Sequence, residues 1–212
     1  MNRTTRIRRM YDILLNHFGD QHWWPAETPW EVAAGALLTQ NTSWKNVEQA
    51  IQNLKTAKLL TPAQLCRCPE AKLQKLIRPS GYFRQKSERL KILACWWQKT
   101  VTTGRKERLN KTELRNELLS LKGVGEETAD SILTYAFNIP SFVIDTYTRR
   151  IAHRHLGTPE KIKYRELQSI FTAALVEDLV LYQNFHALLV QLGKDLSDSS
   201  GCKNECPLCL QL

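Results

Sequence analysis

Residues 121–130 read LKGVGEETAD, and this stretch decides the fold of the chain. Apolar residues at helical spacing stand on both sides of it, which indicates two helices joined by the turn Gly123-Val124-Gly125. Two glycines one residue apart allow a positive φ and let the backbone approach a partner closely. The second helix then begins with N–H groups and the positive end of its dipole, an arrangement that suits a phosphate. The alternative is a plain tight turn between two packed helices.

The rest of the chain has the same helical character, and we expect an all-α protein. Of its 212 residues 42% are hydrophobic, which is enough to build a buried core and excludes intrinsic disorder as the main state. Apolar residues recur at helical spacing, as at Ile7, Met10 and Leu14, whereas the alternation typical of strands is absent. Thr28 followed by Pro29 predicts a helix start, and Gly193 is expected to end a late helix.

The charge balance favours a polyanionic partner. Lys and Arg number 30 and Asp and Glu number 21, which gives a formal net charge of +9. Nucleic acid or a membrane surface would match this charge, and a merely basic protein is the alternative. The longest run of apolar residues and glycine, Val32–Leu38, is far shorter than the roughly 20 residues of a membrane span. Asp12 and Asn16 interrupt any apolar stretch behind the basic N-terminus, so we expect no signal peptide and a soluble, cytoplasmic protein.

Several segments resemble a family of DNA repair enzymes. Residues 121–136, LKGVGEETADSILTYA, resemble the helix-hairpin-helix motif of DNA glycosylases. Residues 137–157, FNIPSFVIDTYTRRIAHRHLG, resemble the segment that carries the catalytic aspartate of the endonuclease III superfamily. Further resemblances follow the family's order: ALLTQNTSWKNV at 36–47, GYFRQKSERL at 81–90 and HALLVQLGK at 186–194.

The resemblance implies two all-helical lobes with the active-site cleft between them. On the family layout we assign residues 29–138 to a central six-helix domain that contains the helix-hairpin-helix motif. Residues 1–28 and 139–212 then form the second helical domain, made where both termini meet. The family layout also implies that this second domain ends in a degenerate cluster loop.

On this resemblance Asp145 is the catalytic residue. Cleavage of an N-glycosidic bond builds positive charge on the sugar, and a carboxylate close to C1′ stabilises that charge and can orient or deprotonate a water. Apart from the resemblance, Asp145 reads as a plain N-cap of the following helix. Bifunctional members carry a lysine two residues after the hairpin glycines, where this chain has Glu127, and a carboxylate forms no Schiff base. We therefore expect a monofunctional glycosylase in which Glu127 assists Asp145 and water is the nucleophile.

An acidic residue in place of that lysine resembles the 3-methyladenine DNA glycosylase branch of the superfamily. A base methylated at N3 is cationic and therefore a good leaving group, and aromatic faces attract it by roughly 1–2 kcal/mol when desolvated. That branch has stacking residues where this chain has Trp24, Pro25 and Trp44, so we assign these three to the base pocket. Ordinary core packing is the alternative for one member of the pair Trp23-Trp24. Rival functions are a mismatch or oxidised-pyrimidine glycosylase with lyase activity, of the endonuclease III type, and a non-catalytic DNA-binding module.

The expected partner is double-stranded DNA that contains a damaged base, bound by a monomer. A glycosylase must extrude its target base, and on the family match Gln40 wedges into the space that the base leaves. Backbone N–H groups of Gly123, Val124 and Gly125 would bind a phosphate, and Lys86 would contact another. For Asn41 and Thr42, which would support the loop of Gln40, a polar helix-capping loop is the alternative, and a solvated charged face is the alternative at Lys86.

The chain has six cysteines, three of them among its last eleven residues. The family's loop supplies four thiolates, spaced Cys-x6-Cys-x2-Cys-x5-Cys, to a [4Fe–4S] cluster. Here Ser197 takes the place of the first, and residues 210–212 offer no fourth. We therefore expect no cofactor, although Cys202, Cys206 and Cys209 could hold an incomplete cluster, or zinc with a fourth ligand from elsewhere. The other cysteines are expected to be packing residues of the central domain: Cys66, Cys68 and Cys95.

Overall fold

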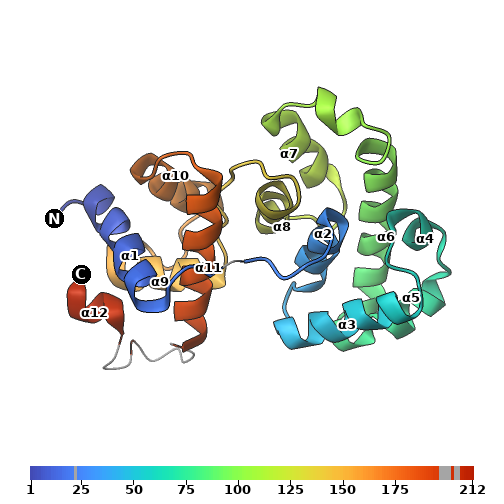
Figure 1. Ribbon diagram of the computed structural model, residues 1–212, viewed down its shortest axis with the longest axis horizontal. Coiled ribbons are helices and arrows are strands. Elements are labelled where there is room, and N and C mark those ends of the chain that lie inside the picture. Colours follow the sequence, from blue (N-terminus) through green and yellow to red (C-terminus); the bar gives the residue numbers. More distant parts are fainter. Residues whose placement is uncertain (22, 196–201, 203–205) are drawn as a thin grey trace. The chain divides into compact units, whose positions relative to one another are not determined.

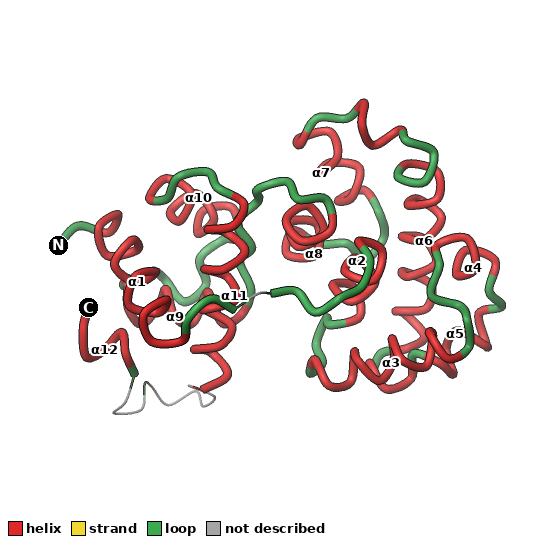
Figure 2. The backbone as a smooth tube through the Cα atoms, viewed as in Figure 1, coloured by secondary structure: helices red, strands yellow, loops and turns green. Residues whose placement is uncertain are grey.

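The computed structural model describes residues 1–21, 23–195, 202 and 206–212. Within these residues every regular element is helical and none is a β-strand (Figure 2), which confirms the predicted all-α class. The chain divides into two compact units. We call residues 1–24 with 138–212 the terminal unit, and residues 25–137 the central unit. The domain boundaries predicted from the sequence fall after residues 28 and 138, whereas those of the structure fall after residues 24 and 137.

The terminal unit is built from both ends of the chain. Its helices are α1 (Arg3–Phe18), α9 (Thr146–Leu156), α10 (Tyr164–Ala174), α11 (Leu179–Asp195) and α12 (Pro207–Gln211). Figure 1 shows the blue helix α1 beside the orange and red helices of the C-terminal part. Buried side chains from both parts share one core, in which the ring of Phe142 stacks on Phe171 with centroids 4.8 Å apart. This core therefore forms only when segments far apart in sequence meet.

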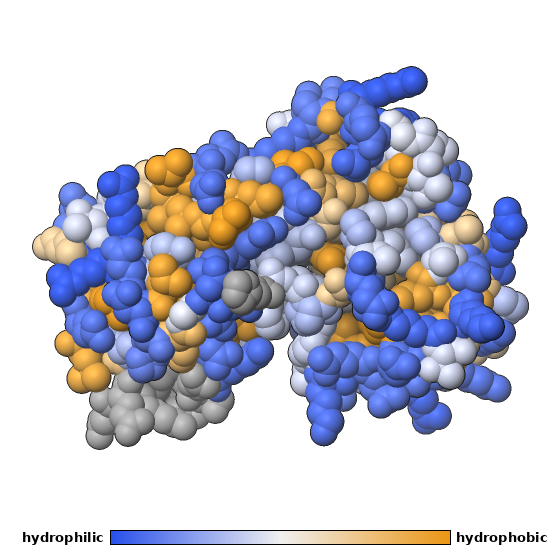
Figure 3. Space-filling view, viewed as in Figure 1, coloured by the Kyte–Doolittle hydropathy of each residue, from blue (hydrophilic) through white to orange (hydrophobic). Residues whose placement is uncertain are grey.

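Some apolar side chains of the terminal unit are exposed. Figure 3 shows an apolar area over α10 and the beginning of α11, and Val176 and Val180 next to these elements are 73% and 64% exposed. A few exposed apolar residues are common on protein surfaces and indicate no function by themselves. Among the described residues, no helix combines the length and the apolar character that crossing a membrane requires.

The central unit is one continuous segment. Its helices are α2 (Pro29–Leu38), α3 (Trp44–Thr56), α4 (Pro62–Arg67), α5 (Glu70–Leu76), η1 (Arg78–Ser80), α6 (Phe83–Thr100), η2 (Arg105–Arg108), α7 (Lys111–Ser120), α8 (Glu126–Ser131) and the π-helical turn η3 (Ile132–Ala136). Trp30 of α2 packs edge-on against Trp97 of α6, with ring centroids 5.3 Å apart. The helices α7 and α8 form the hairpin that the sequence predicts, and η3 continues α8 into the core.

Local sequence signals explain several helix boundaries. Gly19 follows the last residue of α1 and takes a positive φ of 73°. Residues with a Cβ rarely adopt this conformation, so glycine is favoured there. Thr28 caps α2 as expected, because its Oγ1 accepts a hydrogen bond of 3.1 Å from the backbone N–H of Glu31. These boundaries depend only on neighbouring residues, which is why the sequence predicts them.

The prediction that Gly193 ends its helix is wrong, since α11 continues through it to Asp195. A Cβ added at Gly193 would lie 2.3 Å from a ring carbon of Tyr147 in α9, closer than two atoms can approach. The glycine is therefore needed where α9 and α11 pack closely. Tyr147 is two residues after Asp145, so this packing also positions the start of α9.

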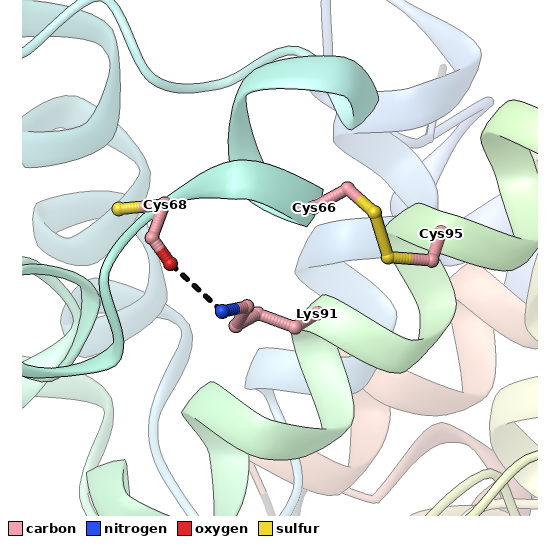
Figure 4. Close-up of a disulfide and its surroundings, with 4 residues drawn as sticks. All are labelled: Cys66, Cys68, Lys91 and Cys95. Atoms are coloured by element: carbon pink, nitrogen blue, oxygen red, sulfur yellow. Dashed lines mark hydrogen bonds between the residues drawn. A yellow bond between two sulfur atoms is a disulfide. The ribbon is translucent and has the colours of Figure 1, made fainter.

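Two cysteines of the central unit also differ from their interpretation as packing residues. Cys66 of α4 and Cys95 of α6 form a disulfide across a sequence separation of 29 residues, with Cα atoms 5.1 Å apart (Figure 4). Cys68 is a buried residue with a free thiol, and its carbonyl accepts a hydrogen bond of 2.8 Å from Lys91 Nζ. The spacing of Cys66 and Cys95 gave no sign of the pairing, because it arises from the packing of α4 on α6.

Candidate functional site

The turn between α7 and α8 has the backbone geometry that the two glycines suggested. Gly123 has a φ of +87°, and the N–H of Val124 donates to the carbonyl of Leu121 over 3.0 Å. Gly125 precedes α8, and no side chain caps that helix. A Cβ added at Gly125 would meet nothing within 4 Å. An acceptor from outside can therefore approach the backbone at the start of α8.

A side-chain network connects this turn to Gln40 and Arg89. The amide Nε2 of Gln40 donates to the carbonyl of Gly123 over 2.9 Å and to Thr128 Oγ1 over 3.0 Å. Its Oε1 accepts from Arg89 Nη1 over 3.2 Å. A Cβ at Gly123 would lie 2.2 Å from Arg89 Cδ, so glycine is required there for space as well as for φ. Gln40 thus contacts the hairpin, whereas its insertion into DNA stays a prediction.

A buried ion pair fixes α8 against α7. Arg115 donates to both carboxylate oxygens of Asp130, from Nε over 2.8 Å and from Nη2 over 2.9 Å. The carboxylate of Asp130 is fully buried and the side chain of Arg115 is 15% exposed. Two parallel hydrogen bonds orient both groups strongly. The sequence did not indicate this pair, because its two members are 15 residues apart on opposite sides of the turn.

Asp145 is the N-cap of α9, and the structure also gives it a second neighbour. Its Oδ1 accepts a hydrogen bond of 2.7 Å from the backbone N–H of Thr148. Its Oδ2 lies 3.8 Å from Nε2 of His186 in α11. Burial lowers the pKa of His186, and the negative charge of Asp145 opposes this more weakly. The imidazole is therefore neutral at pH 7. His186 stands in the segment HALLVQLGK, and no sequence pattern indicated a role for it.

The remaining predicted residues divide between the two units. Glu127 is exposed in the first turn of α8, and Trp44 is half-buried at the start of α3. Trp24 is the last residue of the first segment of the terminal unit, and the exposed Pro25 begins the central unit. The ring of Trp24 packs against that of Trp23, which carries Lys194 Nζ over its face at 5.1 Å. A shared base pocket stays a prediction, as does the cleft between the lobes.

The prediction that Lys86 contacts a phosphate is wrong. Lys86 is only 2% exposed, and its Nζ donates to the carbonyls of Leu38 over 2.8 Å and of Ser80 over 2.6 Å. Burial, with a smaller contribution from the charge of Arg89, lowers the pKa of Lys86 to about 8. Its amine is therefore used inside the central unit, where it ties α6 to the end of α2. An isolated lysine in a basic sequence carries no signal of such burial.

The three C-terminal cysteines lie together, and a histidine that the sequence did not single out joins them. The donor atoms of His155, Cys202, Cys206 and Cys209 all lie within 4.8 Å of one another. Burial lowers the pKa of His155 to about 4, so its ring is neutral and offers a lone pair. Burial also raises the pKa of Cys202 to about 12. Thiol sulfur and imidazole nitrogen are the donor types that proteins use to bind zinc.

Comparison with known families identifies the hairpin. Residues 34–175, from α2 to the end of α10, match the family described as the HhH-GPD superfamily of base excision DNA repair proteins. The chain belongs to this superfamily. The match includes the Gly123–Gly125 turn and Asp145, so the predicted relationship to the endonuclease III superfamily is confirmed.

Relatives of this glycosylase agree with that family. A protein of Methanocaldococcus jannaschii named "Putative DNA repair glycosylase MJ1434" is 45% identical over 212 residues, which cover 98% of this chain and 96% of that protein. Endonuclease III of Thermotoga maritima is 30% identical over 185 residues, covering 85% of this chain and 78% of its own length.

A solved structure is similar as well. The Helicobacter pylori 3-methyladenine DNA glycosylase MagIII, bound to 1,N6-ethenoadenine, superposes with a TM-score of 0.78 and is 28% identical. The superposition covers 93% of this chain and all of that one. Family, relatives and structure therefore agree that this enzyme is a base excision repair DNA glycosylase.

Proposed function

We propose that this glycosylase removes an alkylated base of the 3-methyladenine class from double-stranded DNA and leaves an intact abasic strand. The observation that carries the proposal is Glu127, an exposed acid in the first turn of α8. Lyase members of the family have a nucleophilic lysine there, and a carboxylate cannot form the Schiff base that strand cleavage needs. Similarity to the 3-methyladenine glycosylase MagIII supports the substrate class.

The chemistry of the substrate suits the acidic site. An N3-alkylated adenine already carries a positive charge, so its glycosidic bond breaks without a strong general acid. The sugar becomes positive as the base departs, and the carboxylate of Asp145 stabilises that charge. In this proposal Asp145 also orients a water toward C1′, and Glu127 adds negative charge beside the cationic base.

The surroundings of Asp145 support this role. The hydrogen bond from the N–H of Thr148 holds Oδ1, which restricts the rotation of the whole carboxylate. A neutral His186 lies against Oδ2 and does not cancel its charge. A carboxylate held in one orientation needs little reorganisation when charge develops on the sugar.

The DNA contacts of the proposal use the predicted residues with one exception. The turn Gly123-Val124-Gly125 binds a phosphate through its backbone, and Gln40 occupies the space of the extruded base. Trp24, Pro25 and Trp44 form the pocket that stacks on the cationic base. Lys86 has no part in binding, because its amine is buried. The proposed enzyme is a cytoplasmic monomer.

The test of Asp145 is the release of 3-methyladenine from a methylated DNA duplex. We expect Asp145→Asn to lower the single-turnover rate by about 10²–10³-fold, because the stabilising charge is lost. Its stability is expected to stay near that of the wild type, since Asn also caps helices well. Asp178→Asn is the matched control, because Asp178 Oδ1 likewise accepts from the N–H of Leu181 at the start of α11. Equal rates for the wild type and Asp145→Asn would refute the role of Asp145.

A second experiment tests the monofunctional character. Similarity to endonuclease III of Thermotoga maritima favours a glycosylase with lyase activity as the second candidate. Borohydride traps a Schiff base between enzyme and abasic DNA if one forms. We expect no trapped adduct and an uncut strand. An adduct would contradict the proposed role of Glu127 and favour the second candidate.

A further inference from the structure

We propose that His155, Cys202, Cys206 and Cys209 bind one tetrahedral metal ion of the zinc class, where the family resemblance implies an iron–sulfur cluster. The site lies wholly in the terminal unit and takes no part in the function proposed above. It combines the last turn of α9 with the C-terminal segment, so four donors come from two parts of the chain.

The separation of the donor atoms fits a single ion. Cys202 Sγ lies 3.2 Å and Cys206 Sγ 3.8 Å from His155 Nε2, and all four donor atoms lie within 4.8 Å of one another. Zinc binds sulfur at about 2.3 Å and imidazole nitrogen at about 2.0 Å, so its four ligands stand about 3.6–3.8 Å apart in a tetrahedron. The donors are thus within about 1 Å of the required separations, and Cys3His is a common set for structural zinc.

A [4Fe–4S] cluster does not fit this group. Such a cluster takes four cysteine thiolates, whereas the described residues here offer three cysteines and one histidine. It also places four irons and four sulfides among the ligands, which holds the outer sulfurs farther apart than one shared ion does. The spacing Cys202-x3-Cys206-x2-Cys209 differs from the family's pattern as well. Ser197, which stands where the family has its first cysteine, lies outside the described residues.

A disulfide explains the arrangement less well than a metal ion. A disulfide between two of the three cysteines would not explain why the third cysteine and His155 lie at the same place. All three cysteines are also outside any disulfide. His155 is 6% exposed and Cys206 is 1% exposed, so these polar groups are brought into the core of the terminal unit. Three soft sulfur ligands beside an imidazole nitrogen select zinc over magnesium or calcium, which prefer oxygen.

The position of the site indicates a structural role. His155 is ten residues after Asp145 along α9, which separates the two by about 15 Å at the rise of an α-helix. Cys206 directly precedes α12, and Leu208 of α12 is buried in the core that α1 and α9 share. An ion at this site would therefore join α12 to α9 and stabilise the terminal unit without touching the substrate.

The first experiment measures the metal content of the full-length protein after growth with zinc and iron. We expect one zinc per chain, little iron and no visible absorption from a cluster. Replacement by cobalt(II) is expected to give the visible bands of a tetrahedral ion and a thiolate charge-transfer band. Protein without metal, or four irons per chain with cluster absorption, would overturn the proposal.

Variants then assign the ligands. Cys209 is exposed, so Cys209→Ser should fold, yet we expect it to bind zinc more than about tenfold less tightly. Its melting temperature should no longer fall when a chelator is added, in contrast to the wild type.

Two variants are the controls. Leu210→Ser changes a neighbour on α12 that is 69% exposed, and Cys68→Ser changes a cysteine outside the group. Equal zinc affinity in Cys209→Ser and Leu210→Ser would refute the assignment. Asp145→Asn should keep its zinc, which separates this test from that of the glycosylase chemistry.

Discussion

The helices α8 and α9 both begin at a proposed functional residue, but they begin in opposite ways. The helix α9 follows Asp145, whose carboxylate accepts a hydrogen bond from its own first turn. The helix α8 follows Gly125, which has no side chain and has open space around the missing Cβ. A capped start presents a carboxylate held in one orientation, whereas an uncapped start presents backbone N–H groups to an outside acceptor. The first arrangement suits chemistry on a sugar, and the second suits binding of a phosphate.

The contacts that hold the beginnings of these two helices also differ. The beginning of α8 is held by the bidentate pair of Arg115 and Asp130 and by hydrogen bonds from Gln40 to the turn. Asp145 lies next to the neutral His186, and the start of α9 is held by the close packing of Tyr147 on Gly193. The hairpin is therefore held by directional polar contacts, whereas Asp145 combines one cap hydrogen bond with the packing of α9 on α11. Substitutions at each of these contacts separate the two kinds of support.

The largest effect is expected from the buried ion pair. Asp130→Ala leaves Arg115 without its buried partner, and we expect the free energy of unfolding to fall by about 3–5 kcal/mol. Urea unfolding followed by circular dichroism measures this loss. Glu126→Gln is the control, because Glu126 is a third exposed and its Oε1 lies 3.8 Å from Arg115 Nη2, and its cost should be below about 1 kcal/mol. Equal losses in both variants would contradict a special role for the buried pair.

An intermediate effect is expected from the two hairpin glycines. Gly123→Ala places a side chain at positive φ and against Arg89, so we expect a loss of about 1–3 kcal/mol in stability. Gly125→Ala meets open space and should change stability by less than about 1 kcal/mol. The added Cβ stands where a phosphate must approach. The affinity of the Gly125→Ala protein for abasic DNA should therefore fall by about tenfold, or about 1.4 kcal/mol. Fluorescence anisotropy with labelled duplex measures the affinity, and unchanged binding by Gly125→Ala would argue against backbone contact there.

The smallest effect is a pH dependence near Asp145. Burial lowers the pKa of His186 from its ordinary value of 6.5. The unfolded chain takes up a proton at this residue as the pH falls below 6.5, whereas the folded protein does not, so acid reduces the stability of the wild type. His186→Phe should lack this part of the loss, so lowering the pH from 7.5 to below 6.5 should reduce its stability less than that of the wild type. The exposed His17 gives the control His17→Gln. Parallel stability curves for wild type and His186→Phe would show that His186 is not held neutral.

Local features of the fold follow from the sequence, because they depend on residues a few positions apart. The hairpin turn needs glycine at a positive φ, and α2 needs Thr28 and Pro29 at its start. The cap at Asp145 is of the same kind. Such signals predict the helices and also indicate where functional residues stand along the chain.

Features made by distant residues did not follow from the sequence. The pairing of Cys66 with Cys95 and the burial of Lys86 both contradict the interpretation of single residues. His155 joins Cys202 across 47 positions, and His186 meets Asp145 across a similar gap. A single sequence holds no record of which distant helix faces meet.

The sequence by itself determined the all-helical class, the glycine turn, the repair family and the aspartate proposed for catalysis. Only the tertiary structure decided which distant residues contact the functional segments. It places a neutral histidine next to Asp145, an ion pair between α7 and α8, and a fourth donor beside the last three cysteines. The physical reason is the range of the forces. Backbone preference and helix capping act within one turn of chain, whereas burial and side-chain pairing require the whole unit to be folded.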